Sequence, residues 1–216
     1  MAPPVGLTGT CGATLDEERR FELAISGGGV WTELSFDGNR QHLSEASTAV
    51  SFVYRPSAFS FQVSVGAVLA GSFTGPLGEY DFRPGFLASA SVGYTFLDGN
   101  GPRPYLALIG AAGTSIVPTR SRTDPSDRPD LTATDLRASV VLGKRLFDFW
   151  LPYVGAAVFG GPVFFAPAGQ SRTGSDVHHY RLTAGSSFSL PAHLEAFVEV
   201  GFLGEQAVLG GLGWAF

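Results

Sequence analysis

The chain has 216 residues, of which only 15% are charged and 29 are glycine, and its formal net charge is -5. Soluble domains usually carry about a quarter charged residues, so charge is scarce in this sequence. The basic residues form no stripe, which argues against nucleic acid as a partner, and a single cysteine, Cys11, excludes an internal disulfide framework.

No run of residues is long and apolar enough to form a transmembrane helix, which needs about 18 apolar residues. If the chain crosses a bilayer, it must therefore do so with strands that close into a barrel. Residues 1–19 are predicted to form an N-terminal tail in the periplasm, and residues 20–216 a single all-β domain.

Apolar and polar residues alternate with a period of two from about residue 20 onward, which predicts strands. The clearest case is "FSFQVSVGAVL" at 59–69, where Phe and Val side chains share one face and Ser and Gln share the other. Ten segments have spanning length: 20–29, 46–54, 59–69, 86–96, 104–114, 134–146, 152–163, 180–190, 194–203 and 206–216.

The connections between these segments alternate in length. "RPSA", "LDGNGPRP", "FDFWLP" and "LPAH" are short, whereas 30–45, 70–85, 115–133 and 164–176 are predicted to be long loops. Short turns on one side and long loops on the other are typical of a transmembrane, antiparallel, up-and-down barrel. We expect ten strands. The alternative is eight, because the connection "LGEQ" is unusually short for its side.

Aromatic residues are predicted to form a girdle at each membrane interface, as membrane barrels require. Those at the short-turn ends of the strands are Phe21, Tyr54, Phe59, Tyr94, Phe96, Tyr105, Phe149, Trp150, Tyr153, Phe188, Trp214 and Phe216. Those near the other ends are Trp31, Phe73, Phe82, Phe86, Phe164, Phe165, Tyr180 and Phe202.

The chain ends in "AVLGGLGWAF", which places Leu212, Trp214 and Phe216 on one apolar face. With the alternation and the loop asymmetry, this ending resembles the small bacterial outer-membrane β-barrel proteins over roughly residues 20–216. The resemblance implies a place in the bacterial outer membrane, contact with its lipid and lipopolysaccharide, and insertion by the barrel assembly machinery. It also implies that this last strand is the signal that the machinery recognises.

If the polar face points inward, the lumen is lined mainly by small residues and by a few ionisable ones. These are Glu22, Asp135, Arg137, Arg145, Arg181, Glu195 and Glu199. Arg181 and Glu199 lie on consecutive strands and are predicted to form a cross-strand ion pair. The set would act as an ion-pair clamp, or as the constriction of a channel. Val68, Leu87, Leu106, Leu108, Val141 and Phe197 are also predicted to face inward.

An enzymatic alternative rests on two short motifs. Asp176 and His178 lie in "TGSDVHHYR", and Glu79 and Asp81 lie in "GEYDF" on another long connection. The pairs resemble those of the omptin proteases, ten-stranded barrels in which an Asp-His pair and an acidic pair activate water. The first acidic position is Glu79 where the omptin pattern has Asp, and the chain is shorter than an omptin.

The sequence therefore predicts a non-enzymatic barrel. Its role would be that of a small pore for small solutes, as in a porin or channel, or of a structural or accessory barrel in an envelope assembly with a protein partner. No cofactor and no metal site is predicted. The charged connection "TRSRTDPSDRPD" at 119–130 is a candidate contact for lipopolysaccharide or a partner.

Overall fold

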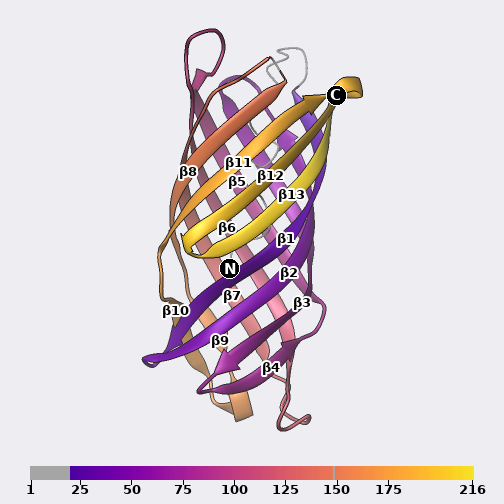
Figure 1. Ribbon diagram of the computed structural model, residues 1–216. Helices are drawn as coiled ribbons and strands as arrows, with labels where there is room; N and C mark the ends of the chain where they lie inside the picture. The colour runs from indigo at the N-terminus through magenta and orange to yellow at the C-terminus, as the bar shows by residue number, and fades with distance from the viewer. Residues whose placement is uncertain (1–19, 148) are drawn as a thin grey trace.

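The computed structural model describes residues 20–147 and 149–216, and all of its long elements are strands (Figure 1). The predicted tail, 1–19, lies outside the described residues, and so does Cys11. The strands are β1 (Phe21–Phe36), β2 (Asn39–Tyr54), β3 (Phe59–Gly75), β4 (Gly78–Phe82), β5 (Gly85–Asp98), β6 (Tyr105–Ser121), β7 (Asp130–Gly143), β8 (Trp150–Gly160), β9 (Val163–Phe165), β10 (Arg172–Asp176), β11 (Tyr180–Leu190), β12 (Leu194–Gly204) and β13 (Gln206–Ala215).

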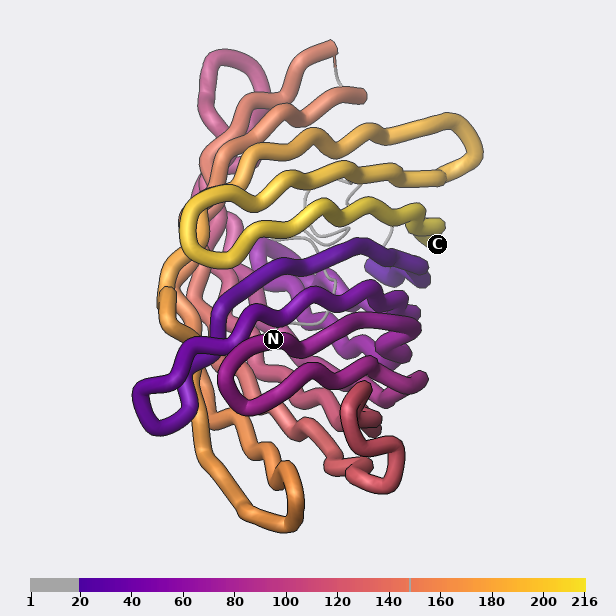
Figure 2. Tube along the Cα trace, turned by 60° about the horizontal axis from the view of Figure 1, so that its bottom comes forward, coloured from indigo at the N-terminus to yellow at the C-terminus, as the bar shows by residue number. Residues whose placement is uncertain are grey.

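These 13 strands form one antiparallel sheet that closes on itself. In three places a long strand is interrupted and continues as the next one. Strands β4 and β5 both lie between β3 and β6, and β8 and β9 both pair with β7. Strands β10 and β11 pair with β9 and β8, respectively, and so continue one another as well. If each of these three pairs is counted as one strand, the wall of the barrel contains ten strands in the described chain. Pairing of β13 with β1, from Glu22↔Ala215 to Trp31↔Gln206, closes the ring (Figure 2). The predicted ten-stranded, all-β, up-and-down barrel is confirmed.

The ring has fewer strands toward one end, because the hairpin β12–β13 turns back before it reaches that end (Figure 1). Beyond its tip, β10 pairs directly with β1 at Leu34↔Asp176 and Phe36↔Gly174. At that level the ring consists of β1, β2, β3, β4, β6, β7, β9 and β10. We call this eight-stranded part the extended end, and the opposite part, with the turns after β2, β5, β7 and β11, the short-turn end.

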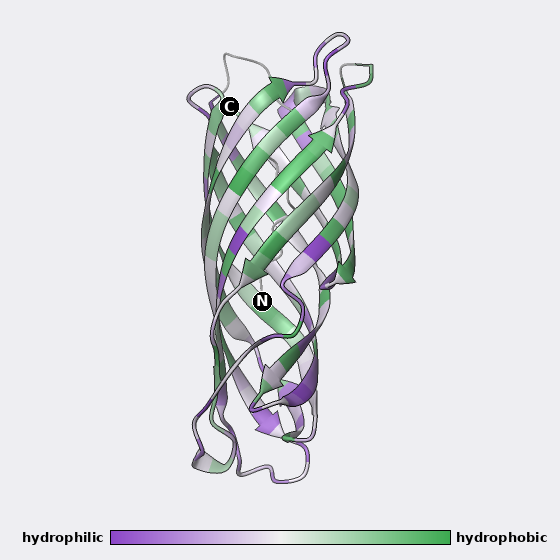
Figure 3. Cartoon of the chain, turned by 90° about the vertical axis from the view of Figure 1, so that its left-hand side faces the viewer, coloured by the Kyte–Doolittle hydropathy of each residue, from purple (hydrophilic) through white to green (hydrophobic). Residues whose placement is uncertain are grey.

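An apolar belt covers the outside of the ten-stranded part (Figure 3). Leu23, Ile25, Val63, Val65 and Leu136 each expose about half or more of their side-chain surface. Phe21, Phe59 and Trp214 border the belt at the short-turn end, and Trp31, Phe86 and Tyr180 border it at the other. An outward apolar band between two aromatic girdles is the surface that a bilayer solvates. No helix in the described part of the chain is long and apolar enough to cross a membrane.

The polarity of the two faces is reversed at the extended end. Here Leu34, Phe36 and Leu131 point inward and are buried, whereas Glu33 and Arg40 lie on the outside. This is the pattern of a barrel in water. It explains why the prediction of long loops at 30–45, 70–85, 115–133 and 164–176 was wrong: the period of two continues there with its faces exchanged, and most of these residues form strands.

Four inward aromatic side chains meet in the bore of the extended end, and we call them the aromatic plug: Phe36, Phe73, Tyr80 and Phe165. The ring centroids of Phe73 and Phe165 lie 5.0 Å apart, although β3 and β9 stand on opposite sides of the eight-stranded ring. Tyr80 contacts Phe165 edge-on, also at 5.0 Å, and Phe36 lies 5.8 Å from Phe73. The plug spans the full width of the lumen.

Several predicted orientations are corrected by the strand register. Leu108 faces outward, Leu106 is only partly buried, and Tyr105 and Tyr153 are inside rather than in the girdle. In "YLALIG" at 105–110 both faces of the strand are apolar, so the sequence does not indicate which face points into the lumen. Phe73, Phe82 and Phe165 are also buried inside the barrel, because the polarity of the faces is reversed at their level.

Substitution of Val65 tests the position of the belt. Val65→Arg puts a charge on the lipid face near its centre, and we expect the free energy of unfolding to fall by about 2–4 kcal/mol. Thr74→Arg, at the extended end of the same strand, should change it by no more than about 0.5 kcal/mol. Urea unfolding in lipid vesicles measures both values. Equal effects of the two substitutions would contradict the assigned belt.

Candidate functional site in the barrel lumen

A network of buried charges lies on one wall of the lumen and is centred on Glu205, at the tip of the hairpin β12–β13. The Nη2 atom of Arg137 donates to both carboxylate oxygens of Glu205, at 3.1 and 3.2 Å. The Nη1 atom of Arg181 donates to Glu205 Oε1 at 2.8 Å. Glu205 is fully buried and forms ion pairs with two arginines, one from β7 and one from β11. We call these residues, with Asp135, Tyr153 and Glu199, the Glu205 network.

The remaining contacts of the Glu205 network extend it along the same wall. Arg181 Nη2 donates to Glu199 Oε1 at 2.6 Å, and Tyr153 Oη donates to the other oxygen of Glu199 at 3.0 Å. Arg137 Nε lies 3.4 Å from Asp135 Oδ2, and its guanidinium lies 4.5 Å from the centre of the Phe159 ring. Because charges in a dry interior are costly unless they are paired and hydrogen-bonded, this arrangement is the one expected of a structural clamp.

The turn that carries Glu205 has a backbone that few residues can adopt. Leu203 and Gly204 have φ angles of 66° and 73°, in the left-handed region. A Cβ atom at Gly204 would collide with the carbonyl oxygen of Tyr180, so only glycine fits there. This tight turn directs the side chain of Glu205 into the lumen, while the adjacent Gln206 stays exposed.

A second charged cluster lies near the short-turn end. Arg55, in the turn after β2, forms an ion pair with the fully buried Glu22 of β1. Glu195 of β12 is also buried, and it lies within electrostatic range of Glu22, Arg55 and Arg145. Among the described residues, neither carboxylate oxygen of Glu195 has a hydrogen-bond partner.

Six of the seven predicted lumen charges point into the barrel and are buried: Glu22, Asp135, Arg137, Arg181, Glu195 and Glu199. Arg145 lies in the turn between β7 and β8 and is partly exposed. Arg181 and Glu199 form the cross-strand pair that their spacing predicts. Sequence reasoning missed Glu205 and Arg55, because an acid or a base in a short turn normally faces water and gives no signal of burial. It also missed the buried Glu45, because residues 30–45 were expected to form a loop, whereas Glu45 lies within β2.

The two pairs of the protease alternative do not come together. Asp176 is buried on the inner side of β10, where desolvation raises its pKa, and His178 faces an outer depression of about 570 Å³ beside Trp31 and Glu33. Glu79 and Asp81 lie on the outside of β4, which is on the opposite side of the ring. Both are held by Arg122, whose hydrogen bond lowers the pKa of Asp81.

In the described part of the chain, no group of three or more His, Cys, Asp or Glu side chains is arranged to hold a metal ion. At the end of the chain, Leu212, Trp214 and Phe216 each expose about half of their surface, at 54%, 50% and 50%. All three lie on the outer, lipid-facing side of the barrel. The predicted assembly signal is therefore accessible from outside once β13 is paired, and its recognition stays a prediction.

No family model matches the sequence, and no curated protein matches it. Among solved structures, the translocator domain of the autotransporter NalP from Neisseria meningitidis is similar, with a TM-score of 0.56 and 11% identity over 91% of this chain and 88% of that domain. The outer membrane protease OmpT from Escherichia coli has a TM-score of 0.55 and 10% identity, covering 91% and 97%. An outer membrane channel from Pseudomonas putida F1 has a TM-score of 0.52 and 9% identity, covering 92% and 96%.

A protease, a channel and a translocator share this architecture, so the likeness concerns the fold and not the activity. It agrees with the apolar belt and with the two aromatic girdles. The chain is a small outer-membrane β-barrel protein by fold, and its place is the bacterial outer membrane.

Removal of Glu205 tests the structural weight of the network. Glu205→Ala leaves Arg137 and Arg181 buried without their common counter-charge, so we expect the free energy of unfolding to fall by about 3–5 kcal/mol. Gln206→Ala, at the exposed neighbouring position, should change it by no more than about 0.5 kcal/mol. Urea unfolding followed by tryptophan fluorescence measures both. A loss below about 1 kcal/mol for Glu205→Ala would show that the arginines find water or other partners.

Proposed function

We propose that this protein is a closed, non-enzymatic barrel that acts as a structural or accessory component of the bacterial outer membrane. The aromatic plug is the observation that carries the proposal. Phe73 contacts Phe165 across the whole ring, so that the two side chains occupy the middle of the bore at the extended end. A constitutive pore requires a continuous water-filled path through the bore.

The pairing of the lumen charges also supports a structural role. Arg137 and Arg181, the two buried arginines of the Glu205 network, are engaged by carboxylates of the same barrel. Guanidinium groups held in this way tie β7, β11 and the tip of β12–β13 together. Groups that served a passing ion would instead be left partly unpaired and in contact with water.

A gated pore is the second candidate, and one observation favours it. Between the plug and the short-turn end, the inner face of the ten-stranded part includes many small polar side chains, among them Ser26, Ser51, Ser64, Ser139 and Ser187. Such a lining suits small solutes. In this alternative, the plug is the gate and must move before transport.

Conductance in planar bilayers distinguishes the two candidates. We expect the wild-type protein to insert without conductance above that of the bare bilayer. Phe73→Ala/Phe165→Ala removes the two rings that meet across the lumen and should produce small conductance steps. A heat-dependent shift in gel mobility confirms that both proteins are folded.

Two outcomes contradict the closed barrel. Steady conductance of the wild type would show an open pore, and voltage-induced steps of the wild type would show a gated one. The matched variant Leu69→Ala, which removes an apolar side chain from the outer face of the same strand, should stay silent.

The protease alternative has its own test. Because Asp176 and His178 lie far around the ring from Glu79 and Asp81, we expect no cleavage of a broad peptide library by the protein folded in lipopolysaccharide-containing vesicles. His178→Ala is the control. Cleavage that disappears in this variant would restore the enzymatic interpretation.

A further inference from the structure

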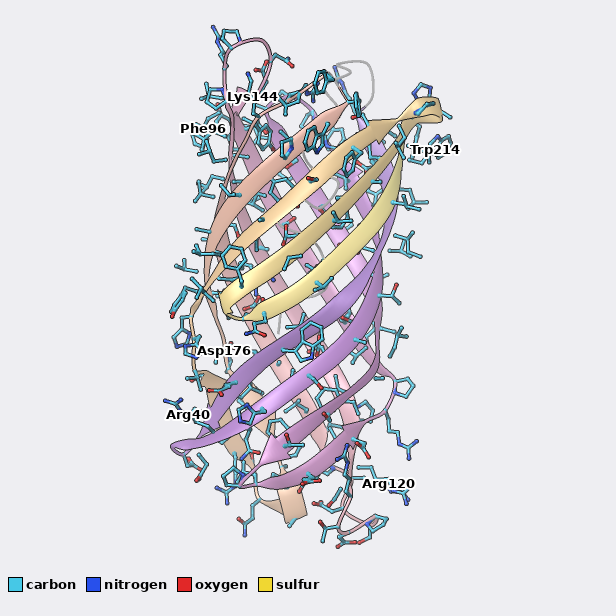
Figure 4. The ribbon with its side chains drawn as sticks, in the orientation of Figure 1. Arg40, Phe96, Arg120, Lys144, Asp176 and Trp214 are labelled. Carbon is cyan, nitrogen blue, oxygen red and sulfur yellow. The ribbon has the colours of Figure 1, made fainter. Side chains whose placement is uncertain are left out.

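Three arginines meet on the outside of the extended end, away from the lumen. Arg83 lies in the link between β4 and β5, Arg120 is near the end of β6, and Arg128 is in the β6–β7 connection. With Pro118 and Thr119, they line a depression of about 280 Å³. We call these three residues the arginine cluster. Figure 4 shows Arg120 on the outer face, at the end of the barrel opposite Trp214 and Phe96.

The backbone fixes the positions of these arginines. The N–H group of Arg83 donates to the carbonyl oxygen of Pro118 at 2.8 Å, which holds the β4–β5 link against β6. The Nε atom of Arg128 donates to the carbonyl oxygen of Pro125 at 3.1 Å, within its own connection. The depression is therefore built on paired backbone rather than on a free loop.

The charge of the arginine cluster is only partly offset by acidic side chains in the described part of the chain. None of its three guanidinium groups forms an ion pair there, although six other arginines of the described chain do so. The nearby acids have their hydrogen bonds with other residues: Arg122 holds Glu79 and Asp81, and Tyr80 donates to Asp127 at 2.9 Å. Asp81 lies opposite Arg120 in the strand register and within electrostatic range of Arg83, but it makes no ion pair with either. Asp130 pairs in register with Pro118 and faces outward, but it makes no ion pair with the cluster.

The level of the cluster relative to the membrane follows from the register of β5 and β6. Phe86 pairs with Ile116, and these are exposed apolar residues at the edge of the belt. Arg120 follows four residues later on the same outer face, which corresponds to about 10 Å along the membrane normal for a tilted strand. This is the level of lipid headgroups.

We propose that Arg83, Arg120 and Arg128 form a binding site for phosphate groups of lipopolysaccharide in the outer leaflet. The guanidinium fork matches the oxygens of a phosphate, and several arginines around one depression can share a doubly charged group. Lipopolysaccharide is the occupant at this level because its phosphates lie just above its acyl chains, next to Ile116 and Phe86. The site does not depend on whether the lumen is open or closed.

The experiment measures binding of lipid A to the full protein folded in detergent micelles, by native mass spectrometry. We expect wild-type protein to bind lipid A that carries both phosphates, and Arg83→Gln/Arg120→Gln/Arg128→Gln to bind it at least about tenfold more weakly. Lipid A without phosphates should bind to the wild type as weakly as intact lipid A binds to the triple variant.

A matched control uses arginines at the same end that do have partners. Arg40 lies 3.6 Å from Glu33, and Arg172 lies 2.9 Å from Asp37. Arg40→Gln/Arg172→Gln should leave lipid A binding within about twofold of the wild type, since neither residue belongs to the cluster. An unchanged heat-dependent gel shift confirms that each variant is folded.

Two results would overturn the proposal: triple-variant binding equal to that of the wild type, or equal losses in the triple variant and in the control. Inorganic phosphate separates the two sources of a phosphate group. If millimolar phosphate displaces lipid A completely, the site serves a soluble anion and the assignment to lipopolysaccharide is wrong. Because conductance is measured separately, failure here leaves the proposed closed barrel untouched.

Discussion

The closed ring of backbone hydrogen bonds is the constraint on which the rest of this structure depends. Inside a bilayer, an unpaired N–H or C=O group has no water to bind, so a sheet can cross only if its first and last strands pair. The pairing of β1 with β13 meets this requirement from Glu22 to Trp31. It also brings the hairpin β12–β13 beside β11, and so determines where Glu205 enters the lumen.

Closure at ten strands leaves an interior that side chains must fill, and the chain fills it in two ways. In the ten-stranded part, small polar side chains and the Glu205 network face inward together with two buried apolar clusters, one around Tyr105 and one around Phe197. At the extended end, two strands are absent and the narrower ring is filled by apolar side chains, with the aromatic plug among them. The change of strand number and the change of filling occur at the same height, because the short hairpin ends there.

Much of this fold could be predicted from the sequence, because residues that face the lumen and residues that face the lipid alternate along each strand of a membrane barrel. The prediction succeeded for "FSFQVSVGAVL", where polar and apolar residues mark the faces, and it gave the right number of wall crossings. It was wrong for Leu108 and Tyr105, where both faces are apolar, and for Phe73 and Phe165, where the solvent outside changes from lipid to water. Glu205 could not be found, since its burial depends on arginines on distant strands.

The strand extension beyond the belt determines what a molecule arriving from the medium meets first. From Trp31 to Phe36, β1 continues for about 16 Å along its own direction, and its partners rise with it. The turn at Asp37 and Gly38 therefore lies at the end of a paired, water-exposed β-hairpin rather than in a flexible loop. Because the backbone of β1 is paired with β2 throughout this extension, few of its peptide bonds are open to a protease in the medium.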